Sequence, residues 1–191
     1  MSGTYQSAVN ASKRVDNASI TIVDGLSASV GLGLIVMKAA SLAKDGTSHN
    51  EIEKLLPKII ISTDLFLVVK DLGYLVKGGR LSSWVKTVAD FLNIRPILSI
   101  KNKGSMGASG IIRGTTNLSA KMSKFILRKM DADKSYNVLI GHSNTLADGE
   151  KLKTLIQKGH NNINFIYLID MGCALGIHAG PGSLVTAIQP V

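Results

Sequence analysis

Apolar residues recur at helical spacing near the start of the chain. Tyr5, Ala8, Val9 and Val15 fall on one side of a 3.6-residue period, so the pattern predicts an amphipathic helix over residues 3–15. The β-branched run Ile20-Thr21-Ile22-Val23 follows and ends at Asp24-Gly25. This run predicts a short buried strand over residues 20–23.

The pattern then returns to helices and one more strand. Residues 31–44 are apolar on almost every side and predict a core helix. Ser48-His49-Asn50-Glu51 has the spacing of a capping box, which predicts a helix start, and Pro57 is expected to kink or shorten that helix. Residues 65–69 predict a strand. This alternation is typical of a parallel α/β sheet, which would place a ligand near Asp24, Gly25 and Ser27 at the carboxyl ends of its strands.

The second half has a different pattern. A short helix over residues 72–77 is expected to stop at Gly78-Gly79, and Ser82 to cap a helix that runs to about Leu92. Five strands and two helices are expected after it. The strands are residues 94–100, a return strand through Ile112, and residues 137–141, 164–169 and 184–188, and the helices are residues 117–130 and 146–158. The predicted fold class is therefore α/β with two lobes, a parallel Rossmann-like α/β lobe and an α+β lobe with a mainly antiparallel sheet, joined around residues 71–79.

Composition narrows the class of function. The net charge of +9 permits an anionic partner, but the lysines and arginines are scattered without a basic, aromatic-rich run, so no nucleic-acid partner is expected. One cysteine excludes an internal disulfide and fits a reducing cytoplasm. One cysteine and four histidines also give no metal-ligand spacing, so no metal or cofactor is expected. No segment has the length of a membrane span, and no signal peptide is visible.

Two polar groups are candidates for binding an anion. Ser2 and Thr4 stand at the first turn of the first predicted helix, where unpaired N–H groups and the helix dipole attract a carboxylate or phosphate. His178 stands among glycines in Gly176-Ile177-His178-Ala179-Gly180-Pro181-Gly182. The alternative is that Ser2 only caps its helix and that His178 is structural.

Six stretches together resemble the signatures of the DegV family. They are Ser2–Ala8, Ile22-Val23-Asp24, Asp71–Ser82, Leu92–Leu98, Arg113-Gly114 and Gly176–Gly182. They occur in the family's order and span the whole chain. The resemblance implies a two-lobed bacterial protein that binds a long-chain fatty acid in an apolar tunnel. It also implies a non-catalytic carrier that presents the acid to a fatty acid kinase for phosphorylation.

The resemblance also implies roles for particular residues. Ser2 and His178 would hold the carboxylate from opposite lobes, with Thr4, Gly180 and Gly182 beside them. Arg113 resembles the arginine near the carboxylate that is involved in handing it to the kinase, and Arg80 would lie at the tunnel mouth. Residues 1–75 would be the remainder of an N-terminal α/β lobe and residues 76–191 a C-terminal α+β lobe.

The chain also departs from the family pattern. Full-length members carry about a third of their length before the Ser-Gly-Thr-Tyr-Gln motif, so the first lobe is expected to lack strands and to expose apolar faces of residues 3–15 and 20–23. Two other functions stay open. One is an enzyme acting on a phosphorylated or carboxylated small molecule, with Asp24 and His178 as acid–base groups. The other is a truncated, non-functional remnant.

Overall fold

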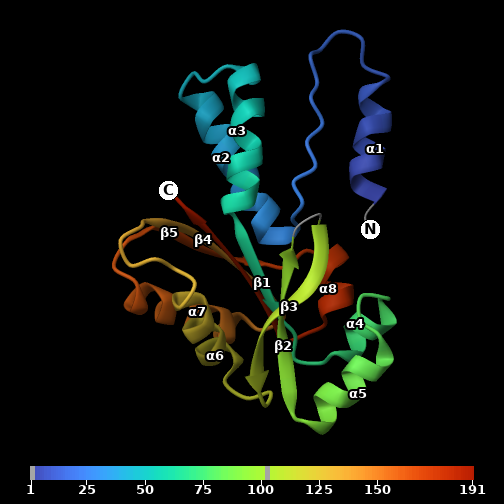
Figure 1. Ribbon diagram of the computed structural model, residues 1–191, viewed down its shortest axis with the longest axis vertical. Coiled ribbons are helices and arrows are strands. Elements are labelled where there is room, and N and C mark those ends of the chain that lie inside the picture. The colour runs from blue at the N-terminus through green and yellow to red at the C-terminus, as the bar shows by residue number, and fades with distance from the viewer. Residues whose placement is uncertain (1–2, 102–103) are drawn as a thin grey trace.

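A computed structural model describes residues 3–101 and 104–191 of the chain, and its centre is one mixed β-sheet (Figure 1). The strand order is β3-β2-β1-β6-β4-β5. The strands are β1 (Asp64–Val68), β2 (Ile94–Lys101), β3 (Ser105–Arg113), β4 (Tyr136–Ser143), β5 (Ile163–Asp170) and β6 (Ser183–Pro190).

Most strands run antiparallel to their neighbours. β1 is antiparallel to both β2 and β6, and β6 is antiparallel to β4. β4 and β5 form the parallel pair. It follows that β1, β3, β4 and β5 point the same way and end at one edge of the sheet, which we call the carboxyl edge.

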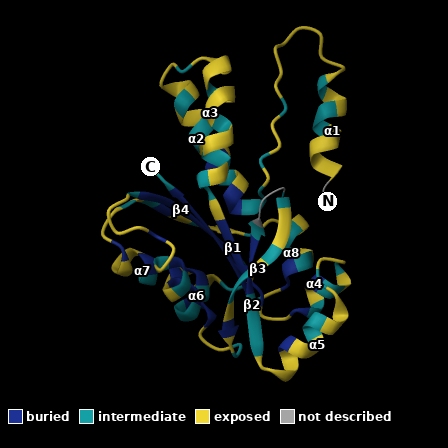
Figure 2. Cartoon of the chain, in the orientation of Figure 1, coloured by how far each residue is buried: buried dark blue, intermediate teal, exposed yellow. Residues whose placement is uncertain are grey.

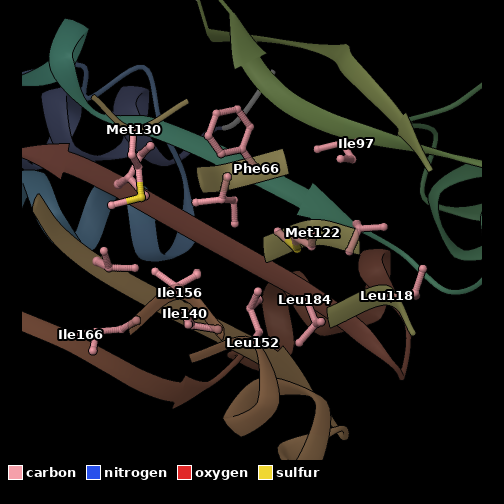
Figure 3. Close-up of a cluster of buried hydrophobic side chains, with 14 of the residues drawn as sticks. Phe66, Ile97, Leu118, Met122, Met130, Ile140, Leu152, Ile156, Ile166 and Leu184 are labelled. Carbon is pink, nitrogen blue, oxygen red and sulfur yellow. The ribbon is translucent and has the colours of Figure 1, made fainter. Parts of the chain in front are cut away.

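Helices cover both faces of this sheet. α6 (Leu118–Leu127) and α7 (Leu146–Gly159) lie on one face, where Met122, Ile126, Leu152 and Ile156 pack with Phe66 and Ile140 (Figure 3). On the other face lie α2 (Ser29–Lys44), α4 (Gly73–Lys77), α5 (Ser83–Phe91) and α8 (Cys173–Ala179). Alternate residues of each strand therefore enter two separate cores, as the pleat requires.

Two parts of the chain project from this layered body. The first half of α2 packs on the sheet, and its second half forms a projecting helical hairpin with α3 (His49–Ser62). α1 (Gly3–Ser12) stands beside the extended segment that follows it (Figure 1). α1 has no buried residue, whereas most of the sheet is buried (Figure 2). Tyr5, Val15, Ile20 and Val23 are all more than a third exposed. This exposure confirms that apolar faces of residues 3–15 and 20–23 are open.

The mixed α/β class is confirmed, and most predicted elements are found within a few residues of their expected bounds. The capping box is present: Ser48 Oγ accepts from the Glu51 N–H, and the Glu51 carboxylate accepts from the Ser48 N–H. Pro57 does not shorten α3, which continues to Ser62. The cap at its start and its packing against α2 outweigh the one backbone hydrogen bond that proline removes.

Two sequence-based expectations were wrong, and one helix was not predicted. Residues 20–23 are extended coil, because no neighbouring strand among the described residues pairs with them; the Thr21 hydroxyl instead bonds to His49 Nε2 at 2.9 Å. The strand at 64–68 is antiparallel to its neighbours instead of parallel. Finally, residues 173–179 form α8, which the glycines and the short length had concealed.

Candidate functional site

A cavity of about 520 Å³ lies between α1, the segment before α2, the end of β2 and the start of β3. We call it the α1 cavity. Its size is within the range of about 300–1,000 Å³ that small-molecule sites occupy. The residues that line it are Tyr5, Gln6, Asp24, Leu26, Ser27, Ala28, Gly79, Arg80, Ile100, Gly104 and Met106. It therefore combines an aliphatic wall with a few polar side chains.

Among the described residues that line this cavity, Arg80 carries the positive charge, and the backbone before it fixes its position. Gly79 has a φ of +68°, which favours glycine after a helix end. The N–H of Arg80 donates to the Leu75 carbonyl at 2.8 Å, and its Nη1 donates to the Gly78 carbonyl at 2.7 Å. Because a guanidinium has five N–H donors, others can turn toward an anion in the cavity.

Ser27 adds a hydroxyl to the same wall. Its Oγ is buried and has no hydrogen-bond partner among the described residues. A buried hydroxyl without a partner is costly. This hydroxyl lies against Gly31 in α2, where a Cβ would collide with the Oγ. Asp24 and Ser27 line this cavity and Gly25 does not, and the residues before them are not a strand.

His178 lies in α8, directly behind the wall that carries Arg80. Its ring packs on Gly78 so closely that a Cβ at Gly78 would collide with Nδ1 of the histidine. Gly79 and Arg80, the next two residues, line the α1 cavity. The fold therefore brings His178 close to Arg80 through Gly78, but His178 does not line the cavity itself.

Gly180 and Gly182 lie between α8 and β6 at the carboxyl edge. Gly180 has a φ of +73° and lies against the ring of Tyr74. Gly182 has a φ of +80°, and a Cβ there would lie 2.7 Å from Cδ of Lys70. Pro181 and Gly182 border a second cavity, of about 540 Å³, with Lys70, Asp71, Tyr74, Thr115, Asn144 and Thr145. Gly180 allows close packing of α8 against α4, and Gly182 allows the chain to pass close to Lys70. Neither glycine lines the α1 cavity.

Arg113 is separated from the α1 cavity by the length of β3. Met106 lines the cavity near the start of β3, and Arg113 is its last residue, so their backbones lie about 23 Å apart at the usual strand rise. Arg113 is exposed, and its carbonyl accepts from Lys121 Nζ at 2.5 Å. Thr115, two residues on, borders the cavity at the carboxyl edge.

The first turn of α1 is only partly described. Ser2 lies outside the described residues. Thr4 is exposed at the start of α1, and the next two residues, Tyr5 and Gln6, line the α1 cavity. The fold thus brings this turn and Arg80 to the same cavity.

A third cavity, of about 350 Å³, adjoins the first. It is lined by Leu26, Ile60, Ile61, Thr63, Asp64, Phe66, Ser99, Ile100, Ser109 and Lys129, and we call it the Asp64 cavity. Partial desolvation by this wall raises the pKa of the Asp64 carboxyl, while the positive charge of Lys129 acts in the opposite direction. Ser99 and Ser109 form a hydrogen bond across β2 and β3.

Sequence reasoning missed the apolar wall of the α1 cavity. Leu26, Ile100 and Met106 come from distant segments, and a periodicity pattern does not reveal which of them meet. One local signal existed for Leu26: an aspartate two residues earlier accepts its N–H at 3.0 Å, the bond of an Asx turn.

Comparison with known proteins places the chain among bacterial relatives. The family model described as "Uncharacterised protein, DegV family" matches residues 1–190. A DegV domain-containing protein of Clostridium perfringens is 32% identical over 190 residues, which are 99% of this chain and 66% of that protein. The chain therefore spans about two thirds of the length of the curated relatives it matches.

Solved structures of DegV proteins have a fold similar to that of this chain. A DegV lipid binding protein from Thermotoga maritima is 28% identical with a TM-score of 0.85, over 100% of this chain and 65% of that one. A fatty acid binding DegV family protein from Streptococcus agalactiae is 26% identical with a TM-score of 0.81, over 100% of this chain and 66% of that one. Within the described residues, no helix is both long and apolar enough to cross a membrane.

Proposed function

The chain belongs to the DegV family, and on that premise we propose that it binds a long-chain fatty acid in the α1 cavity. The observation that carries the proposal is the composition of the cavity wall. Leu26, Ile100 and Met106 offer aliphatic surface to a hydrocarbon tail, and Arg80 offers charged donors to a carboxylate. The relatives of known structure that bind lipid or fatty acid support the same ligand.

A carboxylate entering this cavity loses water, so it needs donors there. In the proposed complex Arg80 supplies charge, and Ser2, Thr4 and the first N–H groups of α1 supply further hydrogen bonds. His178 does not line the cavity, so we propose that it acts through Gly78, on which its ring packs, and supports the backbone that carries Arg80. Gly180 acts by letting α8 approach α4, and Gly182 by letting the chain pass close to Lys70.

We assign Arg113 to a different step. It is exposed at the carboxyl edge, away from the α1 cavity, where it can contact a protein partner. The proposed partner is a fatty acid kinase that phosphorylates the presented carboxylate, while this chain acts as a non-catalytic carrier. A reducing compartment suits the single, exposed Cys173, so we propose the cytoplasm as its location.

The test compares a fatty acid with the fatty alcohol of the same length. We expect the purified chain to gain thermal stability with the acid, because a ligand of the native state must raise its melting temperature. Arg80→Gln should weaken acid binding roughly tenfold or more, since a charged hydrogen bond is lost, and should leave alcohol binding nearly unchanged.

Arg128→Gln is the matched control, because Arg128 is an exposed arginine at the end of α6. It should bind the acid like the unmodified chain. If neither acid nor alcohol stabilises the protein, and mass spectrometry finds no co-purified lipid, the proposed function is wrong.

A further inference from the structure

Two residues form the partition between neighbouring cavities. Leu26 and Ile100 line both the α1 cavity and the Asp64 cavity. They come from the segment before α2 and from the end of β2, so the wall that the two cavities share is built from two distant segments.

The backbone holds Leu26 in an unusual conformation. Its φ is +43°, a left-handed value that a leucine rarely adopts. The Asp24 carboxylate accepts the Leu26 N–H at 3.0 Å and stabilises this turn. The leucine side chain also lies in contact distance of Gly104, where a Cβ would be 3.5 Å from Cδ2 of Leu26. The hydrogen bond to Asp24 and the contact with Gly104 therefore hold Leu26 in this strained conformation.

The Asp64 cavity differs in character from the α1 cavity. Its lining includes the apolar side chains of Ile60, Ile61 and Phe66, together with Asp64 and Lys129. A hydrocarbon tail that passed Leu26 would gain contact with apolar surface there. The partition therefore decides whether that surface is available.

We infer that Leu26 and Ile100 are a length gate, which limits how far the tail of a fatty acid extends beyond the α1 cavity. This inference rests on the proposed function, and it adds the residues that set the preferred chain length. The gate acts on the tail alone. Acids short enough to end before Leu26 are not affected by it.

The experiment measures affinity for saturated fatty acids of increasing length. In Leu26→Gly the cavities join, and the left-handed turn is retained because glycine adopts a positive φ without strain. We expect short acids to bind as in the unmodified chain. Long acids should bind up to about fourfold tighter for each methylene that enters the new space. Ile100→Ala opens the partition from the other side and should shift the profile in the same direction.

Met37→Ala is the control, since Met37 is 39% exposed like Leu26 but lies on the outer surface of α2 near Tyr167. Its length profile should superimpose on that of the unmodified chain. Thermal unfolding monitored by circular dichroism confirms that each variant is folded. If the unmodified chain binds acids and the profiles of both gate variants stay parallel to it, the gate is wrong and the proposed function stands. If the unmodified chain binds no acid, both fail together.

Discussion

Gly180 shows how one residue can decide the packing of two helices. Its backbone, at φ +73° and ψ 168°, lies in a region that is almost exclusive to glycine. The ring of Tyr74 occupies the place where a side chain would project. α8, which carries His178, can therefore approach α4 only because position 180 has no Cβ.

We predict that Gly180→Ala destabilises the protein by about 1–3 kcal/mol from backbone strain, with the collision against Tyr74 adding to this loss. Chemical denaturation measures the change. Gly172→Ala is the matched control: Gly172 has a φ of −59° and a ψ of 152°, and no atom lies near a Cβ built there. That variant should be neutral or slightly more stable. Equal losses in both variants would contradict the argument.

The individual residues of the site were only partly predictable. The motifs around His178 and Arg80 indicated polar groups near a ligand. In the fold both residues lie close to the end of α4. No sequence motif indicated that the ring of His178 packs on Gly78 or that Leu26 lines two cavities. Both depend on contacts between segments far apart along the chain.

At the scale of elements, α3 shows how local chemistry fixes a helix end. The helix has no buried residue, so its stability depends more on its cap than that of a core helix does. Ser48 accepts the N–H of Glu51 at 3.4 Å, and the carboxylate of Glu51 accepts the N–H of Ser48 at 3.1 Å.

Ser48→Ala should destabilise the helix by about 1 kcal/mol, the usual cost of removing a serine N-cap. Hydrogen exchange of the α3 amides measures this local loss, and Ser48→Asp should restore most of the protection. A variant Ser48→Ala with unchanged protection in α3 would show that packing against α2, and not the cap, holds this helix.

The same cap should make α3 sensitive to pH. Hydrogen bonds from the Ser48 side chain and then from its backbone hold the pKa of Glu51 below its ordinary value. The stabilisation is therefore complete above the ordinary pKa of a glutamate and is lost as the pH falls through the lowered value. The difference between Ser48→Ala and the unmodified chain should shrink over that acidic range.

At the scale of the whole molecule, stability is unevenly distributed. β6 lies inside the sheet with nearly every residue buried, whereas α1 has none. Figure 2 shows this contrast between the dark sheet and the exposed α1. Opening β6 requires the loss of both cores. Opening α1 exposes little new surface.

We predict that the amides of α1 exchange with solvent orders of magnitude faster than those of β6, because local opening costs far less than global unfolding. Hydrogen exchange with mass spectrometry measures both in one experiment. Protection of α1 that rises with protein concentration would instead indicate that its apolar side, including Tyr5 and Val15, is covered by association. Strong protection at every concentration would contradict the prediction.

Most helices, the strands of the second half and the cap at Ser48 can be predicted from the chain alone, because they depend on spacing and hydrogen bonds within a few residues. The family's motifs are also present in order. The coil at residues 20–23, the direction of β1 and the position of Leu26 and Ile100 in one shared wall depend on contacts between distant segments. A strand needs a partner for its backbone and a cavity needs walls from several segments. Both requirements depend on residues that are far apart in the sequence, so a local pattern does not reveal whether they are met.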